Sequence, residues 1–226
     1  EREKPCEAAS SAAAERVLAI VICGDRGLCG GFNNNIIKEA EKDFHDDWEK
    51  PVIVAIGTKG KEYFEKRGYE IYKEYLAPPE DISFLETREI SKPIIDMYDR
   101  GEIDEIVLIY TGFKNSIEQE VKNVILLPFD IQPDPDILIH DQEVEYEPSV
   151  EEVFNYLVPK YVEMMIYAAV VESATCEHAA RRLAMENATD NASDMLGSLS
   201  QYYNRARQAE ITDEIIEIVA GAEAQK

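Results

Sequence analysis

The stretch SATCEHAARRLAMENATDNASDMLGSLSQYYNRARQAEITDEIIEIVAGAEA, residues Ser173–Ala224, decides the fold class of this chain. It contains no proline, and Gly197 is its only glycine before Gly221. Residues of high helix propensity dominate it, chiefly Ala, Leu, Met, Glu, Gln and Arg. The pattern predicts one long helix with a narrow apolar stripe, typical of a coiled-coil seam. The apolar residues recur at spacings of three and four, and they include Ala188, Ala192, Met195, Leu199, Tyr202, Ala206, Ile211, Ile215, Ile218 and Ala222.

Such a helix is too long for a small domain. At a rise of about 1.5 Å per residue it would extend roughly 70 Å, so we expect it to project from the body to which it belongs. Its stability would come mainly from packing, because an isolated helix with a narrow stripe is only marginally stable. The segment Glu1–Glu15 is too short to pair along it. We therefore expect a pairing helix from outside this sequence.

Upstream of this helix, apolar runs alternate with helical patterns. The runs that predict strands are Val17–Cys23, Pro51–Gly57, Glu105–Thr111 and Val121–Leu127, and Tyr69–Leu76 predicts an extended segment. The segments that predict helices are Phe32–Phe44, Thr58–Arg67 and Pro79–Arg100. Continuous apolar runs are typical of strands buried on both faces of a parallel or mixed sheet. Their alternation with helices predicts an α/β layer fold.

A linker separates this α/β region from the final helices. Between residues 128 and 148 the composition shifts to Pro, Asp and Glu, with one short expected strand, Ile137–His140. Ser149 and Glu152 have the spacing of a capping box and predict the start of a helix. Pro159 predicts a kink or a fresh helix start. The expected divisions are a leader (1–16), an α/β globular domain (17–148) and a C-terminal helical shaft (149–226).

The composition argues against several classes of function. The 226 residues carry a formal net charge of −23, which opposes binding to nucleic acid or to an anionic membrane surface. No apolar run approaches the roughly 18 residues of a membrane span, so we expect no direct bilayer insertion. The cysteines, Cys6, Cys23, Cys29 and Cys176, show no C-x-x-C spacing, and we expect no metal site and no cofactor. Cys23 and Cys176 are expected to be small buried side chains.

The glycine-rich segment Gly24–Gly31 follows an expected strand and precedes an expected helix, where a phosphate can meet backbone N–H groups. Its spacing, however, is G-x-x-G-x-x-G-G rather than G-x-G-x-x-G, and Asp25 would repel a phosphate. We expect a structural turn and keep a nucleotide-binding α/β enzyme as an alternative. The expected turn residues are Gly24, Asp25, Arg26, Gly27, Gly30 and Gly31. The histidines, His45, His140 and His178, lie in separate elements and predict no catalytic site.

The final helix carries four arginines among many carboxylates: Arg181, Arg182, Arg205 and Arg207. One interpretation is pairing within the helix at a spacing of four, as for Glu177 with Arg181. The other is contact with carboxylates of a partner, for which the planar guanidinium group is well suited. Near the end of the helix, several apolar residues would form an exposed patch that a partner must cover, and this leaves a coiled-coil adaptor as another alternative. These residues are Ile211, Ile215, Ile218 and Val219.

Three segments resemble the γ subunits of rotary, F-type ATP synthases. They are EHAARRLAMENATDNA (Glu177–Ala192), YNRARQAEITDEIIEIVAGAEA (Tyr203–Ala224) and GDRGLCGGFN (Gly24–Asn33). The resemblance implies a Rossmann-like α/β globular domain with a long C-terminal coiled-coil helix, and a glycine-rich turn that binds no nucleotide. It also implies an N-terminal helix antiparallel to the C-terminal one, most of which this sequence lacks. The implied function is a central rotor shaft that couples transmembrane ion flow, such as hydrogen ion transport, to ATP synthesis or hydrolysis at β subunits. No catalytic residue of its own is implied.

The resemblance further implies partners and contact residues. The partners are three α and three β subunits, the ε subunit and the membrane c-ring, at the periphery of an energy-transducing membrane and on its cytoplasmic side in bacteria. The residues that match family contacts with the α/β ring are Arg181, Arg207, Gln208, Thr212, Glu214, Ile215, Ile218 and Val219. Tyr146 and Glu147 match positions at the contact of the globular foot with the membrane ring or ε.

Overall fold

The computed structural model describes residues 16–46, 51–76, 82–129 and 146–224. The chain divides into two compact units, Glu1–Arg181 and Arg182–Lys226. The first unit contains a β-sheet with its covering helices. The second consists of the C-terminal portion of helix α4 (Val150–Glu223). The expectation of a long helix across Ser173–Ala224 is thus confirmed.

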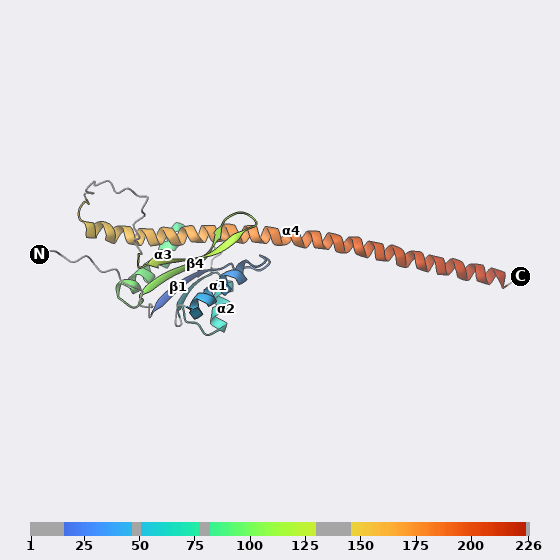
Figure 1. Cartoon of the computed structure of the whole chain (residues 1–226), viewed down its shortest axis with the longest axis horizontal. Helices are drawn as coiled ribbons and strands as arrows, with labels where there is room; N and C mark the ends of the chain where they lie inside the picture. The colour runs from blue at the N-terminus through green and yellow to red at the C-terminus, as the bar shows by residue number, and fades with distance from the viewer. Residues whose placement is uncertain (1–15, 47–50, 77–81, 130–145, 225–226) are drawn as a thin grey trace. The chain divides into compact units, whose positions relative to one another are not determined.

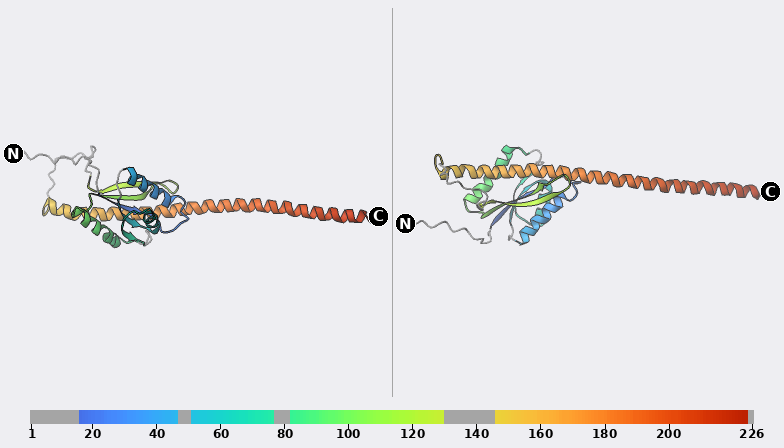
Figure 2. Two further views of the ribbon diagram at one scale, coloured as in Figure 1. Left: turned by 90° about the horizontal axis from the view of Figure 1, so that it is seen from below. Right: turned by 45° about the horizontal axis from the view of Figure 1, so that its top comes forward.

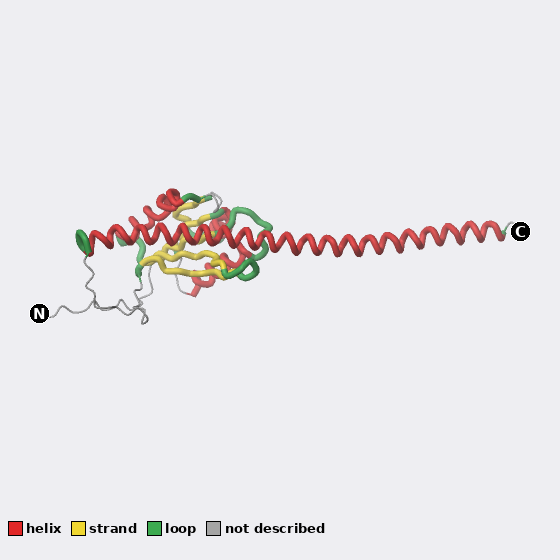
Figure 3. The backbone as a smooth tube through the Cα atoms, turned by 90° about the horizontal axis from the view of Figure 1, so that it is seen from above, coloured by secondary structure: helices red, strands yellow, loops and turns green. Residues whose placement is uncertain are grey.

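The first unit is built on a five-stranded sheet with the strand order β3-β2-β1-β4-β5. Figure 3 shows its strands in yellow and the helices in red. Neighbouring strands from β3 to β4 are parallel, and β5 is antiparallel to β4. The strands are β1 (Val17–Ile22), β2 (Val52–Ile56), β3 (Ile71–Tyr75), β4 (Glu105–Phe113) and β5 (Gln119–Leu127). The expected strands are confirmed with small differences at their ends, and the mixed α/β sheet is confirmed with them.

Two hydrophobic clusters lie on opposite faces of this sheet, because successive side chains of a strand point to opposite sides. Helices α1 (Phe32–Asp46) and α2 (Thr58–Lys66) cover one face (Figure 1). Helix α3 (Phe84–Asp99) and the first part of α4 cover the other (Figure 2). The β1 residues are divided between them, with Val17, Ala19 and Val21 on the α1 face and Leu18, Ile20 and Ile22 on the α3 face.

Helix α3 begins at Phe84, so the expected start at Pro79 is wrong. Ser83 is extended and forms a complete capping box with Glu86. The Ser83 Oγ accepts the Glu86 backbone N–H at 3.3 Å, and the Glu86 carboxylate accepts the Ser83 N–H at 2.7 Å. The reciprocal pair satisfies backbone donors that the helix leaves open, which fixes the first turn at this position.

Helix α4 begins after Ser149, as its sequence predicts. The Ser149 Oγ accepts the Glu152 backbone N–H at 3.2 Å. The helix continues through Pro159, so the expectation of a fresh start there is wrong. Proline removes one backbone hydrogen bond, but Val162 and Ile166 in the following turns are fully buried in the α3-side cluster. Packing of these side chains outweighs the local preference. The expected strand Ile137–His140 lies outside the described residues.

The ends of β1 and β2 approach each other so closely that only glycine fits at residue 57. Gly57 has φ 93°, and a Cβ there would lie 2.0 Å from the carbonyl oxygen of Cys23. At the same place the Cys23 N–H donates to the Ile56 carbonyl at 2.8 Å. Gly57 therefore allows the ends of β1 and β2 to lie this close together.

We expect Gly57→Ala to lower the free energy of unfolding by about 3 kcal/mol, because it combines a left-handed backbone with a backbone clash. Gly68→Ala is the matched control. Gly68 has φ 80° with nothing within 4 Å of an added Cβ, so this change should cost only about 1 kcal/mol. Urea unfolding followed by circular dichroism measures both, and equal costs for the two variants would contradict the close approach.

Candidate functional site

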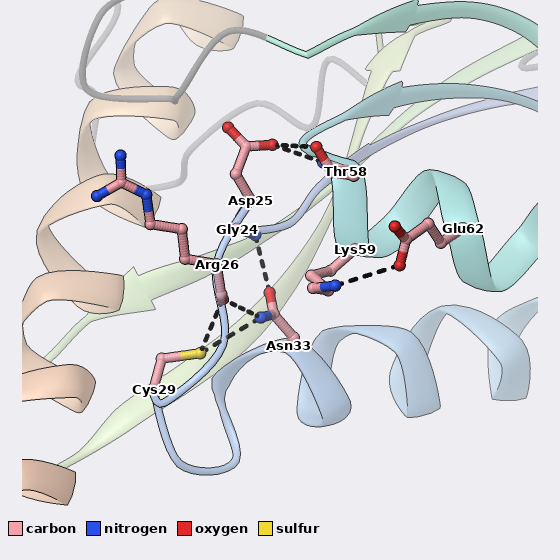
Figure 4. A network of polar contacts seen from close by, with 8 residues as sticks. All are labelled: Gly24, Asp25, Arg26, Cys29, Asn33, Thr58, Lys59 and Glu62. Carbon is pink, nitrogen blue, oxygen red and sulfur yellow. Dashed lines mark hydrogen bonds and ion pairs between the residues drawn. The ribbon is translucent and has the colours of Figure 1, made fainter.

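The Gly24–Gly31 turn is held by contacts with its own backbone and with the start of α1 (Figure 4). The Gly24 N–H donates to Asn33 Oδ1 at 2.8 Å, and Asn33 Nδ2 donates to the Arg26 carbonyl at 3.3 Å. The Cys29 thiol donates to the same carbonyl with a sulfur–oxygen distance of 3.7 Å. A side chain thus occupies the Gly24 amide, one of the donors that a phosphate would use in a nucleotide-binding turn.

The acidic residue of the turn caps a different helix. Asp25 Oδ1 accepts both the backbone N–H and the hydroxyl of Thr58, each at 2.7 Å (Figure 4). Thr58 is the first residue of α2, whose preceding residue, Gly57, has no side chain with which to cap the helix. A carboxylate at a helix N-terminus satisfies an open backbone donor and interacts favourably with the helix dipole. Asp25 therefore occupies the anion position at the start of α2.

The strand order places a crevice between β1 and β4. In open sheets of this order, ligands bind outside the carboxyl ends of the strands, where the direction of winding reverses. Here β1 pairs with β4 only as far as Val21 with Ile109, whereas β4 continues to Phe113. Beyond that point, the backbone N–H groups of Thr111 and Phe113 have no partner in β1.

Helix α4 fills this crevice and supplies the missing acceptors. Ser173 Oγ accepts the Thr111 N–H at 3.2 Å, and Glu172 Oε1 accepts the Phe113 N–H at 2.8 Å. Gln119 of β5 donates through Nε2 to a backbone carbonyl of the same part of α4 at 2.9 Å. The place where related folds hold a nucleotide is therefore taken by the protein's own helix.

A buried carboxylate closes the crevice against the glycine turn. Glu177 is 4% exposed, and its side chain lies against Gly24, where an added Cβ would fall 2.7 Å from the Glu177 carboxyl carbon. Glu177 forms an ion pair with Arg181 one helical turn further on. The pairing of Glu177 with Arg181 within the helix is confirmed. The structure brings the expected contact residue Arg181 next to the glycine turn.

The described cysteines are buried and free. Burial raises the pKa of Cys23 to about 12, with the nearby Glu177 carboxylate adding to the effect, and burial raises the pKa of Cys176 to about 11. Both thiols are therefore neutral at physiological pH, which confirms the expectation that Cys23 and Cys176 are small buried side chains. Cys6 lies outside the described residues.

The described residues contain neither a candidate metal site nor a candidate membrane span. No group of three His, Cys, Asp or Glu side chains there has the arrangement needed to hold a metal ion. No described helix combines the length and the apolar character required to cross a membrane. His178 is exposed on α4, whereas His140 and the side chain of His45 fall outside the described residues.

In the second unit, Arg182–Lys226, the expected contact residues are exposed on one continuous helix. They are Arg207, Gln208, Thr212, Glu214, Ile215, Ile218 and Val219. The Thr212 hydroxyl donates to the Gln208 carbonyl at 2.7 Å, so it lies along the helix surface. The exposed fractions of Ile215 and Ile218 are 55% and 71%. Such apolar exposure on a helix is typical of a surface that another chain covers.

An apolar groove of about 470 Å³ in the first unit was not predicted from the sequence. It lies between the start of α3, the segment after β5 and the first turns of α4, and its aromatic lining comprises Phe84, Phe129, Phe154 and Tyr161. Tyr146 packs beside it, with its ring centroid 6.5 Å from that of Phe154. The spacing of apolar residues in the first turns of α4 could have indicated this face. Glu147 follows Tyr146 and is exposed.

The fold and the site together define a Rossmann-like α/β chain whose ligand crevice is filled by a long C-terminal helix with exposed apolar side chains. This chain belongs to the ATP synthase family, whose model matches residues 2–225. The match extends across both compact units. Its relatives are γ chains of that ATP-synthesising complex, so the identification made from three short segments is confirmed.

Two relatives illustrate the similarity. The ATP synthase gamma chain of Alkaliphilus metalliredigens is 46% identical over 92% of this chain and 73% of its own length. The ATP synthase gamma chain of Symbiobacterium thermophilum is 44% identical over 92% of this chain and 72% of its own length.

Solved structures support the same fold. The central stalk and c-ring of the Tetrahymena thermophila mitochondrial ATP synthase includes a chain that matches with a TM-score of 0.63 and 26% identity, covering 80% of this chain and 79% of that one. A chain of the Euglena gracilis mitochondrial ATP synthase matches with a TM-score of 0.68, covering 94% and 73% of the two chains. Its identity of 18% shows the fold alone.

Because Asp25 caps α2 from a distant turn, we expect Asp25→Ala to lower the free energy of unfolding by about 1 kcal/mol. Asp25→Asn keeps an oxygen acceptor at the same place and should cost only about a few tenths of that. Chemical denaturation of the two variants measures the difference. The capping role would be refuted if the two substitutions were equally destabilising.

Proposed function

We propose that this chain is the rotor shaft of a rotary ATP synthase, which couples transmembrane ion flow to ATP synthesis and hydrolysis at the β subunits. In this proposal the chain has no catalytic residues of its own. It lies at the periphery of an energy-transducing membrane, on the cytoplasmic side in a bacterial cell. Its functional divisions are a leader (1–16), a globular foot (17–148) and a shaft (149–226).

The observation that carries this proposal is the exposure of large apolar side chains along the helix of the second unit. Met195, Leu196 and Leu199 are each more than half exposed, as are Ile215, Ile216 and Ile218. Left in water, such a surface promotes aggregation, so a partner that encloses the helix is required. A ring of α and β subunits around a central helix would provide that enclosure.

The mechanism would be differential binding. An asymmetric shaft contacts the three β subunits differently in each orientation, so each orientation stabilises one conformation of each catalytic site over the others. Turning the shaft would then move every site through successive affinities for ADP, phosphate and ATP. The same coupling works in reverse, because the free energy of interaction between two sites is reciprocal.

The proposed grip on the ring combines polar and apolar contacts. Arg207 and Gln208 can donate to carboxylates and backbone carbonyls of a partner, and guanidinium groups form such contacts with defined geometry. Thr212 and Glu214 follow within the next two turns. Ile215, Ile218 and Val219 would enter an apolar sleeve. Arg181 is already paired with Glu177, so its contact with the ring would be shared with that internal ion pair.

The proposed foot contact lies around Tyr146 and Glu147. Both are exposed, and the apolar groove beside Tyr146 adds surface that a protein partner can bury. The ε subunit and the membrane c-ring are the partners assigned to this end. The high negative charge of the chain makes direct binding to an anionic bilayer unfavourable, so attachment would pass through protein contacts.

We expect the chain, completed by its N-terminal helix, to assemble with separately produced α and β subunits as one copy per three of each. Replacing Arg207 and Gln208 together by alanine should weaken assembly at least tenfold, because two polar contacts worth about 1 kcal/mol each are lost. Native mass spectrometry across a dilution series measures the change. Arg205→Ala, an exposed arginine two residues away that is not among the contact residues, is the matched control.

Each outcome of this assembly experiment is informative. If the double variant assembles as strongly as the control, the shaft function would stand, but Arg207 and Gln208 would be refuted as contact residues. A completed chain that forms no complex with the subunits would refute the rotor function itself. Saturable heat on titration with ATP in the absence of other subunits would favour the nucleotide-binding alternative.

A further inference from the structure

The contacts that join α4 to the end of β4 are hydrogen bonds, whereas most of the interface upstream of them is apolar. Upstream, α4 packs on the sheet through apolar side chains such as Val162, Ile166 and Val170. Apolar packing is non-directional, so it opposes a small rotation of the helix about its axis less steeply than hydrogen bonds do. Hydrogen bonds weaken steeply when their distances and angles change. The contacts of Glu172 and Ser173 are therefore the ones most sensitive to such a rotation.

The contacts of Glu172 and Ser173 also lie close to the end of the buried part of α4. Glu177 is the last buried residue of α4, and the second unit begins at Arg182. Twisting force that travels along the helix from the second unit thus meets Glu172 and Ser173 close to where the helix enters the first unit. The apolar contacts at Val162–Val170 come later along the same path.

The acceptors are anchored on the side of the sheet. Glu172 Oε1 receives the Phe113 N–H at 2.8 Å and the Lys122 ammonium group at 3.3 Å. Lys122 belongs to β5 and reaches the helix across Gly112, where an added Cβ would lie 2.3 Å from its Cε. The contact thus ties α4 to both strands of the β4–β5 hairpin. Hydrogen bonds to a charged carboxylate are stronger than neutral ones.

We propose that Glu172 and Ser173 form a torsional clamp, through which turning force passes between the sheet of the foot and helix α4. The proposal rests on the rotor function given above and adds the residues that transmit the force inside this chain. Glu172 and Ser173 are positioning residues, because they act on the helix and on no substrate.

The test measures the torsional stiffness of the rotor in an assembled α/β ring with the completed chain. A bead is attached to the foot through Lys66→Cys on the exposed side of α2, with Cys6→Ser to avoid a second attachment. The angular variance of the bead during pauses at limiting ATP is inversely related to the stiffness. We expect the double variant Glu172→Ala with Ser173→Ala to increase this variance at least twofold.

Two accompanying measurements separate a clamp from a role in folding alone. The ATP hydrolysis rate of the unloaded complex at saturating ATP should change less than twofold, because the catalytic sites are untouched. Amide hydrogen exchange at Thr111 and Phe113 should rise at least tenfold, since both donors lose their acceptors. Thr175→Ala, an exposed residue of the same helical turn whose hydroxyl bonds only along the helix, should change neither quantity.

The results distinguish failure of the clamp from failure of the rotor function. A double variant with the same angular variance as Thr175→Ala would overturn the clamp. If the double variant does not assemble, Ser173→Ala alone should still increase the variance, and no increase there would overturn the clamp as well. A bead that does not rotate on the unsubstituted complex would instead overturn the rotor function, and the clamp with it.

Discussion

Backbone donors at the end of β4 must find acceptors, and this requirement links the sheet to α4. The strand extends beyond its parallel neighbour β1, so the N–H groups of Thr111 and Phe113 have no acceptor in β1; Thr111 is buried, whereas Phe113 is exposed. An unsatisfied buried donor costs about 1–3 kcal/mol, so the Thr111 position strongly favours an acceptor of fixed geometry. In related folds, loops and ligands occupy the same crevice. Here Glu172 and Ser173 of α4 occupy it and accept hydrogen bonds from the end of β4.

The face of α4 toward the sheet shows how charge can be buried in an acidic chain. Glu163 and Glu177 are almost fully buried, and Glu172 is partly so. Each has a cationic partner: Lys160 for Glu163, Lys122 for Glu172 and Arg181 for Glu177. A buried pair adds little net stability compared with apolar packing, but breaking it is costly. Lys122 with Glu172 joins the helix to β5 and therefore favours one position of the helix on the sheet, whereas the other two pairs lie within α4. The apolar side chains between them supply most of the burial.

The sequence predicts the parts of this structure that depend on local patterns. Continuous apolar runs gave the strands, and the uninterrupted run of helix formers gave α4. The start of α3 was misplaced because Pro79 precedes a stronger local signal, the pair of Ser83 and Glu86. The filled crevice could not be predicted, because Glu172 and Ser173 resemble ordinary polar residues of a helix until a strand distant in sequence ends beside them. The expected contact residues of the second unit were predicted from family resemblance, since exposed positions carry no packing signal.

The two parts of α4 obtain their stability in different ways. Between Val162 and Glu177, one face of the helix is buried against the rest of the first unit, which stabilises this part without a partner. After Arg182 its large side chains are exposed, and burying each of them would contribute about 2 kcal/mol. An isolated helix of this kind is marginal in water, so its order depends on the chains that enclose it. The sheet-packed part of α4 is therefore stabilised within this chain, whereas the exposed part gains its stability only where another chain covers it.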